Sequence, residues 1–212
     1  PKLVIHGGGN TSVKTKIRDI HGESTNVLCI KGSGWDLGNI EPEGLPAVKI
    51  AALQKLVKLN SLSDESMVNI QRVNLLDANS PNPSVETLLH AFLPHKFIDH
   101  THSNAILALC DQPNGRKICE EVFGGRVVYV PYIMPGFALA KKSLQCFDAA
   151  VSKSETEPLG MILLKHGLVS FGSTARESYD RMIHLVNIAE RRIKKSRKRV
   201  LAQRTIPKKI EK

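Results

Sequence analysis

The chain has 212 residues, of which 42% are hydrophobic and 24% are charged, the composition of a globular domain with enough length to bury a core. It contains no run of about 18 or more apolar residues, which excludes a membrane-spanning helix. Its four cysteines are widely spaced and form no CxxC pair, so reduced thiols are favoured over a disulfide framework. We therefore expect a cytoplasmic protein.

The net charge of +10 is concentrated at the C-terminal end. Residues 191–212 hold eleven Lys or Arg and one acid, whereas the rest of the chain holds nineteen residues of each sign. We therefore predict one domain over residues 1–190 and a basic tail over 191–212, interpreted as a helix extension or linker. Because the tail has no aromatic residue, nucleic acid is not the expected partner. The alternative interpretation is that the tail binds an acidic partner, a nucleic acid or a membrane surface.

Apolar runs and helical periodicity alternate along the chain, which predicts an α/β fold. Strands are expected at 3–5, 12–17, 26–31, 96–100, 126–131 and 161–166. Helices are expected at 47–60, from 62–67 onwards, and at 85–93, 103–110, 137–151 and 174 to about 198. The predicted N-caps are Ser63, Ser84 and Ser103, because a serine hydroxyl accepts a free N–H of the first helical turn.

The segment DHTHSNA, residues 99–105, places two histidines two apart at a predicted strand end. Because side chains alternate along a strand, His100 and His102 project from one face, and Asp99 from the other as an expected hydrogen-bond acceptor for a ligand. His166 precedes a glycine in KHGLVSFG. Three imidazoles are the ligand set of an open catalytic metal site, for which zinc is suited and Mn, Co or Fe is the alternative. Ordinary core histidines are the competing interpretation.

Two further side chains, Glu86 and Tyr132, are candidates for proton transfer, and His90 is a less favoured candidate ligand. Glu86 lies in the first turn of a predicted helix, where a general base beside a metal and an acid favoured by the helix dipole both fit. His90, one turn later, is expected to be a packed or hydrogen-bonded core histidine. Tyr132 lies between a predicted strand and helix, where its hydroxyl would either exchange a proton with a developing alkoxide or face water.

Two glycine-rich loops follow predicted strands, HGGGNTS at 6–12 and KGSGWDLG at 31–38. Backbone N–H groups in such loops, together with hydroxyl and amide side chains, form an anion cradle. Neither loop matches the Walker pattern or GxGxxG, so each loop taken alone favours a tight structural turn.

Six blocks in order resemble the class II aldolase/adducin family, and the resemblance extends from HGGGNTSVK to SYDRMIHLVNIAE. They are most similar to the aldolase domain of bifunctional rhamnulose-1-phosphate aldolase/alcohol dehydrogenase proteins. The blocks are HGGGNTSVK, KGSGWDLG, PSVETLLHAFLP, DHTHSNA, VPYIMPGF and KHGLVSFGSTARESYDRMI. No glycine-rich nucleotide-binding motif follows them, so we expect the dehydrogenase activity to be absent from this chain.

The resemblance implies a three-layer α/β/α fold around a mostly antiparallel sheet, commonly assembled into fourfold-symmetric tetramers with active sites between subunits. It implies that Glu86 moves the proton of an enediolate and that Tyr132 acts at the aldehyde-side oxygen. The implied zinc ligands are His100, His102 and His166. The implied phosphate cradle is formed by Gly9, Asn10, Ser33, Gly34 and Ser84. Where the family often has a second serine before the acid, this chain has Val85, which weakens the expected binding of phosphate.

The predicted function is that of a zinc-dependent lyase. It would cleave a ketose 1-phosphate, such as rhamnulose 1-phosphate, into dihydroxyacetone phosphate and an aldehyde through a metal-stabilised enediolate. A sugar-phosphate epimerase or dehydratase that uses the same metal and base is one alternative. A non-enzymatic, adducin-like interaction module is the other, and the presence of all three histidines with Glu86 argues against it.

Overall fold

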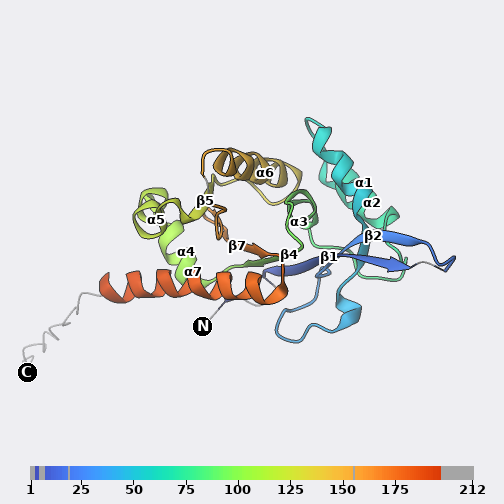
Figure 1. Ribbon diagram of the computed structural model, residues 1–212, viewed down its shortest axis with the longest axis horizontal. Coiled ribbons are helices and arrows are strands. Elements are labelled where there is room, and N and C mark those ends of the chain that lie inside the picture. The colour runs from blue at the N-terminus through green and yellow to red at the C-terminus, as the bar shows by residue number, and fades with distance from the viewer. Residues whose placement is uncertain (1–2, 5–7, 19, 155, 197–212) are drawn as a thin grey trace, which may run out of the picture.

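A seven-stranded sheet forms the middle layer of the computed structural model, which describes residues 3–4, 8–18, 20–154 and 156–196 (Figure 1). The strand order is β3-β2-β1-β4-β7-β6-β5, and among the described strands β5 and β6 pair in parallel while the other pairs are antiparallel. The strands are β1 Asn10–Arg18, β2 Ser24–Ile30, β3 Ala47–Lys49, β4 Phe97–Thr101, β5 Val127–Val130, β6 Gly160–Leu163 and β7 Gly167–Gly172. The predicted α/β class and mostly antiparallel sheet are confirmed.

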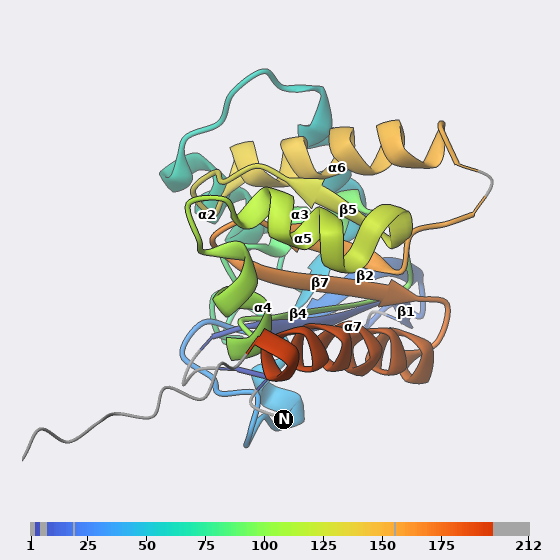
Figure 2. The same ribbon diagram turned by 90° about the vertical axis from the view of Figure 1, so that its left-hand side faces the viewer.

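Helices cover both faces of this sheet, which gives the three layers seen in Figure 2. One face packs against α1 (Ile50–Lys55), α2 (Asp64–Val73), α3 (Thr87–Phe92) and α6 (Phe137–Val151). The other packs against α4 (Asn104–Cys110), α5 (Gly115–Phe123) and α7 (Ala175–Ser196). Among these described helices, none combines the length and the apolar character required to cross a bilayer.

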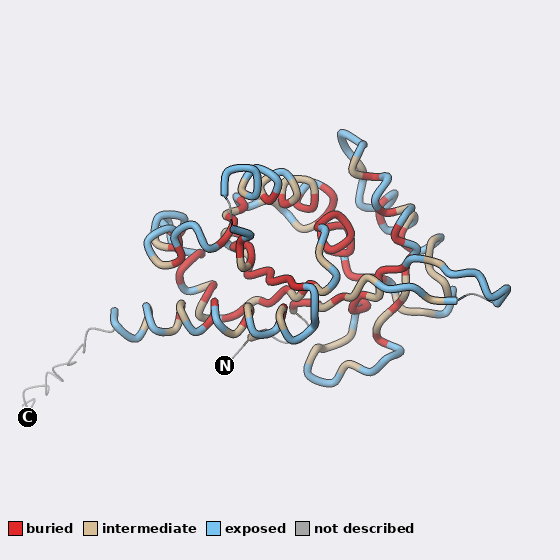
Figure 3. The backbone as a smooth tube through the Cα atoms, viewed as in Figure 1, coloured by how far each residue is buried: buried red, intermediate tan, exposed pale blue. Residues whose placement is uncertain are grey.

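The central strands are largely buried (Figure 3). Their apolar side chains divide between two cores, one on each face of the sheet. In β6, Met161 packs with α6 and α3, whereas Ile162 packs with α4 and α7. In β7, Val169 and Leu168 divide in the same way. This is the two-residue alternation of a strand, with an apolar residue on each side.

Several predicted boundaries differ from the structure. The helix expected at 47–60 is wrong at both ends, because Ala47–Lys49 pairs with β2 as strand β3 and α1 ends at Lys55 before a 3-10 turn at Leu56–Lys58. Strand pairing here overrides the helical spacing of the apolar residues. The strand expected at 3–5 is absent at Leu3 and Val4, which are not in a strand, and Ile5 lies outside the described residues.

The predicted N-caps have different outcomes. Ser63 is confirmed, because its Oγ accepts the Ser66 N–H at 3.2 Å. Ser84 accepts the Glu86 N–H at 3.3 Å, which forms a turn before α3, and the helix begins at Thr87, two residues later than expected. Ser103 holds the N-cap position of α4 but makes no capping hydrogen bond through its side chain.

Helix α6 matches the predicted range 137–151, whereas α5 and β7 were not predicted. Helix α5 begins at Gly115, and Asn114 holds its N-cap position without a capping hydrogen bond from its side chain. Strand β7, GLVSFG, is buried throughout and shows no polar alternation. Helix α7 continues past the predicted domain boundary at 190 to Ser196, and the tail from 197 lies outside the described residues.

Candidate metal centre

Three neighbouring segments place histidines at one end of the sheet. His100 lies near the end of β4, opposite Asn10 of β1 and Val169 of β7. His102 follows directly after β4, and His166 lies in the turn that joins β6 to β7. The structure therefore brings together three histidines that the sequence separates by up to 66 positions.

The three imidazole rings converge. The Nε2 atoms of His100 and His102 lie 2.9 Å apart, and the ring centroids are 4.8 Å (His100–His102), 4.9 Å (His100–His166) and 5.1 Å (His102–His166) apart. One ligand atom from each ring lies within 4.8 Å of the others. This group has the nitrogen donors and the spacing to hold a single divalent cation.

The backbone fixes the orientation of the His100 ring. His100 Nδ1 lies 3.0 Å from the carbonyl oxygen of Leu168. Because a carbonyl only accepts, Nδ1 carries the proton and Nε2 presents its lone pair toward His102 and His166. A ring nitrogen held in this way by a backbone acceptor is typical of metal-ligating histidines.

Glu86 lies against these rings as a buried carboxylate. Its Oε1 is 3.1 Å from His166 Nε2, and its Oε2 is 3.4 Å from His100 Nε2. Asn10 Nδ2 donates to Oε2 at 2.7 Å and to Ser84 Oγ at 3.2 Å. Burial alone raises the pKa of Glu86, but the electrostatic interaction with His100 and the hydrogen bonds with His166 and Asn10 outweigh it and lower the pKa overall. The carboxylate is therefore ionised at neutral pH.

Burial keeps the ring charges low. It lowers the pKa of His100, and with His100 and His166 nearby it lowers the pKa of His102 to about 4. The neutral rings of His100 and His102 offer lone pairs at pH 7, which metal binding requires. Glu86 Oε1 is also buried, and apart from its 3.1 Å contact with His166 Nε2 it has no hydrogen-bond partner among the described residues. Three imidazole nitrogens and a buried carboxylate oxygen fit a zinc ion.

The residues expected to form an anion cradle lie on two loops near Glu86 and in the segment before α3. Gly9 has a φ of +73°, and a Cβ there would lie 2.6 Å from the His100 carbonyl oxygen, so the loop requires glycine. The second loop is fastened to segment 82–83, because the Ser33 N–H donates to Asn82 O at 2.7 Å and Ser33 Oγ donates to Pro83 O at 3.3 Å. Gly34 follows with a φ of +89°. Asn10 and Ser84 thus contact Glu86 directly, and Ser33 and Gly34 lie on the neighbouring loop.

Lys31 was missed by the sequence reasoning. It begins this second loop and is only 4% exposed, and its Nζ lies 3.5 Å from the carbonyl oxygen of Gly32. Burial lowers the pKa of Lys31, while the carboxylates of Asp36 and Glu86 oppose that effect. The sequence does contain a signal for this residue, because Lys31 directly precedes the GSG of the second loop at a strand end. A lysine at that position indicates a positive charge beside the expected anion cradle.

The expected role of Asp99 is wrong. Its side chain does point away from the metal ligands, but it accepts hydrogen bonds from Thr11 Oγ1 at 2.6 Å and from Ser178 Oγ at 2.6 Å. The acceptor for His100 is the Leu168 carbonyl instead. Asp99 therefore joins β1 and β4 to α7 on the opposite face of the sheet.

His90 and Tyr132 lie outside the histidine group. His90 is fully buried in α3, and its Nδ1 lies 2.7 Å from Ser12 Oγ, which confirms a hydrogen-bonded core histidine. Burial lowers its pKa to about 3, so the ring is neutral. Tyr132 is 53% exposed between β5 and α6, and its hydroxyl lies 3.0 Å from Met134 Sδ. The structure does not bring Tyr132 into the hydrogen bonds that join Glu86 to its described neighbours.

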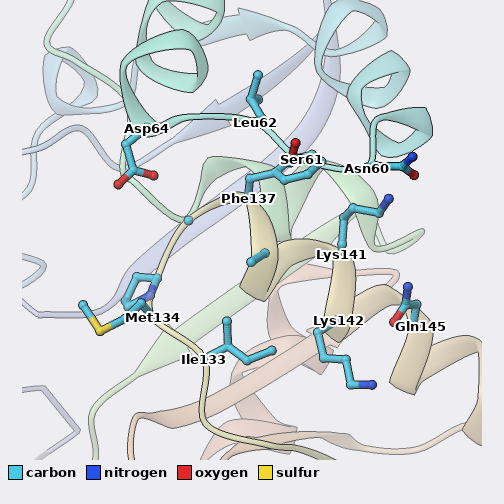
Figure 4. Close-up of a pocket in the computed structure, with 13 residues that line it drawn as sticks. Asn60, Ser61, Leu62, Asp64, Ile133, Met134, Phe137, Lys141, Lys142 and Gln145 are labelled. Carbon is cyan, nitrogen blue, oxygen red and sulfur yellow. The ribbon is translucent and has the colours of Figure 1, made fainter.

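A cavity of about 490 Å³ lies beside the loop that carries Tyr132. It is formed by the segment before α2 and by the start of α6, and Figure 4 shows Asp64 across it from Lys141 and Lys142. Neither Glu86 nor the three histidines line it. This cavity is therefore separate from the candidate metal centre.

The close packing around residue 167 explains why a glycine follows His166. A Cβ at this position would lie 2.5 Å from Thr101 O, 3.0 Å from His100 Cε1 and 3.2 Å from His102 Cδ2. We expect Gly167→Ala to displace the two rings and weaken zinc binding about 10- to 100-fold, with a loss of about 1–3 kcal/mol in unfolding free energy. Competition with a coloured chelator and urea unfolding measure the two effects. Gly125→Ala, where a Cβ meets nothing within 4 Å, is the control, and equal zinc affinity in the two variants would contradict the prediction.

The model of the Class II Aldolase and Adducin N-terminal domain matches residues 1–193. Since this match covers most of the sequence, the chain belongs to the class II aldolase and adducin family. The predicted family is therefore confirmed. The chain thus has the fold of a family that includes metal-dependent aldolases, and it carries a group of histidines that could hold a metal ion.

The similar proteins differ in length and in how much they imply. The protein named uncharacterized oxidoreductase YuxG from Bacillus subtilis (strain 168) is 40% identical over 187 residues, which cover 88% of this chain but 26% of that protein. The N-terminal class II aldolase domain of a conserved protein from Thermoplasma acidophilum is 41% identical, with a TM-score of 0.82 over 91% of this chain and 86% of that one. A sugar-phosphate aldolase from Thermotoga maritima, 18% identical with a TM-score of 0.64 over 92% and 90%, shares the fold. The chain therefore spans about a quarter of its curated relative.

Proposed function

We propose that this chain is a zinc-dependent aldolase that cleaves a ketose 1-phosphate, such as rhamnulose 1-phosphate, into dihydroxyacetone phosphate and an aldehyde. The observation that carries the proposal is the convergence of three imidazoles on one point with the ionised carboxylate of Glu86 beside them. Family membership and the fold shared with a sugar-phosphate aldolase support the same reaction class.

The metal ligands in this proposal are His100, His102 and His166. When bound there, zinc supplies Lewis-acid stabilisation of the negative charge that develops on the substrate oxygens, and another divalent metal is the alternative. The reaction removes the proton of the C4 hydroxyl, breaks the C3–C4 bond and leaves an enediolate. Tyr132 is the proposed group that handles the proton at the aldehyde-side oxygen, and the ionised Glu86 carboxylate takes up that proton and then delivers it to C3.

The substrate phosphate would bind to the two loops beside Glu86. The proposed cradle consists of Gly9, Asn10, Ser33, Gly34 and Ser84. Lys31 adds a buried positive charge at the start of the second loop. A buried ammonium is a strong partner for a phosphate, so it compensates for the hydroxyl that is missing at Val85. This compensation supports a phosphorylated substrate.

The proposed assembly is a cytoplasmic homotetramer. Val85 next to Glu86 is 43% exposed, and the neighbouring pair Tyr132 and Met134 is 53% and 68% exposed. Tyr132 and Met134 share the loop between β5 and α6, and exposed apolar side chains that lie together are typical of protein contacts. We also propose that residues 1–190 form the catalytic domain and that 191–212 act as a helix extension or linker.

Product analysis tests the reaction class. The purified protein, loaded with zinc, is incubated with phosphorylated and unphosphorylated ketoses and deoxyketoses, and the products are followed by NMR. The proposal expects two carbon fragments from a ketose 1-phosphate and none from its unphosphorylated counterpart. A single isomerised product would identify an epimerase and a single dehydrated product a dehydratase. No turnover of any sugar would favour the adducin-like module, and each of these three outcomes overturns the proposal.

A further inference from the structure

Another cavity lies along the strands β1 and β2, away from the candidate metal centre. It has a volume of about 600 Å³, within the usual range of roughly 300–1,000 Å³ for small-molecule sites. The cavity is formed by β1, β2, α1 and the residue before β4, in the region of Figure 1 where α1 lies above the β1–β2 pair. It is lined by Lys14, Thr15, Lys16, Asn26, Val27, Ile50, Gln54 and Lys96.

This cavity is separated from the metal centre along β1. Asn10 marks the metal end of the strand, and Lys14 and Lys16 follow four and six residues later. At about 3.3 Å per residue, these lysines start roughly 13–20 Å further along the strand. A ligand at the lysines would therefore occupy a site distinct from the cradle beside Glu86.

The lining combines three positive charges with hydrogen-bond donors and contains no acid. Lys14, Lys16 and Lys96 supply ammonium groups, and the other polar side chains are a hydroxyl and two amides. Within the described part of the chain, no carboxylate forms an ion pair with any of the three amines. Three unneutralised cations around one cavity attract an anion.

Lys14 is the most buried of the three. Its Nζ contacts the carbonyl oxygen of Leu93, a neutral partner. Burial lowers the pKa of Lys14 to about 8, which reflects the cost of holding a positive charge away from water. A bound anion would offset that cost, since buried charges are usually paired.

We propose that this cavity binds a small phosphorylated metabolite, whose phosphate is held by the ammonium groups of Lys14, Lys16 and Lys96. The concave shape and the absence of aromatic lining residues favour a small molecule over a nucleic acid, which binds to stacking platforms. The site does not depend on the metal centre or on the proposed lyase activity.

Chemical footprinting of lysines tests the site with inorganic phosphate as the probe. The intact protein is acetylated with a water-soluble amine reagent, with phosphate or with potassium chloride at equal ionic strength, and the rate at each lysine is read by peptide mass spectrometry. At a phosphate concentration four times the Kd, the pocket lysines should react about fivefold more slowly, because only the free form reacts. Lys117 and Lys153, outside the cavity, should be unaffected. Lys31 reports separately on the cradle beside Glu86.

A matched pair of variants makes the test local. Lys16→Gln combined with Lys96→Gln removes two exposed lining charges and should abolish the protection of Lys14. Lys55→Gln combined with Lys58→Gln removes two exposed charges outside the cavity and should leave that protection intact. Protection of Lys14 that survives the first pair, equal slowing at Lys117 and Lys153, or no slowing at the pocket lysines would each overturn the proposal.

Discussion

Replacement of His102 by alanine is expected to lower the zinc content of the purified protein from about one ion per chain to nearly none and to abolish aldehyde release. The remaining donors would be two imidazoles and the Glu86 carboxylate, and His102 Nε2 lies only 2.9 Å from His100 Nε2 at the point of convergence. Its loss opens the site to water on one side. Metal analysis by plasma emission and an aldehyde-release assay with a ketose 1-phosphate measure the two effects.

The control is His184→Ala. His184 is an exposed histidine of α7, outside the converging group, so its replacement should leave both zinc and activity at the wild-type level. A His102→Ala protein that keeps one zinc per chain would show that the ion is held elsewhere. Equal zinc loss in the two variants would show that the metal depends on overall histidine content rather than on this geometry.

Glu86→Gln is expected to separate metal binding from proton transfer. The amide has the shape of the carboxylate and can still accept the Asn10 hydrogen bond through its oxygen. Zinc should therefore remain bound, because all three imidazole ligands are still present. It cannot carry the proton, so kcat should fall by about 10²- to 10⁴-fold, the usual contribution of a general acid or base. Steady-state cleavage rates, measured beside zinc content on the same preparation, test both parts.

Glu65→Gln in the first turn of α2 is the matched control, because Glu65 is an exposed carboxylate on another helix. Its kcat should equal that of the wild type. If Glu86→Gln kept its zinc and a kcat within about twofold of the wild type, well short of the loss expected for an acid–base group, another residue would have to carry the proton.

The sequence was sufficient to predict the pairing of His100 with His102, because strand alternation is a local rule that one short segment satisfies. It was also sufficient for the fold class and for α6, whose apolar spacing is regular over 15 residues. The position of His166 beside this pair depends on the hairpin that β6 and β7 form. Only β6 of that hairpin is predicted by the sequence, so the proximity of His166 is an expectation that the sequence alone does not explain.

Other features depend on contacts that no local pattern contains. Asp99 accepts a hydrogen bond from Ser178, which is 79 positions away, and no local sequence pattern predicts such a distant partner. The burial of Lys31 depends on the loop that folds back onto segment 82–84. Strand β3 exists because β2 offers it a pairing edge, against a helical spacing that continues into α1.

Because β1 pairs with β4 from Asn10 to Val13, the number of residues in this interval is as constrained as their identity. Asn10 and Ser12 point toward Glu86 and His90, while Thr11 between them points to Asp99 on the other side. A single residue inserted immediately before Val13 would turn these side chains to the opposite faces of the sheet. The Asn10 amide would then no longer contact the Glu86 carboxylate, and the Thr11 hydroxyl would point away from Asp99. Natural variation in chain length among relatives should therefore avoid this short interval and collect in segments outside the paired strands.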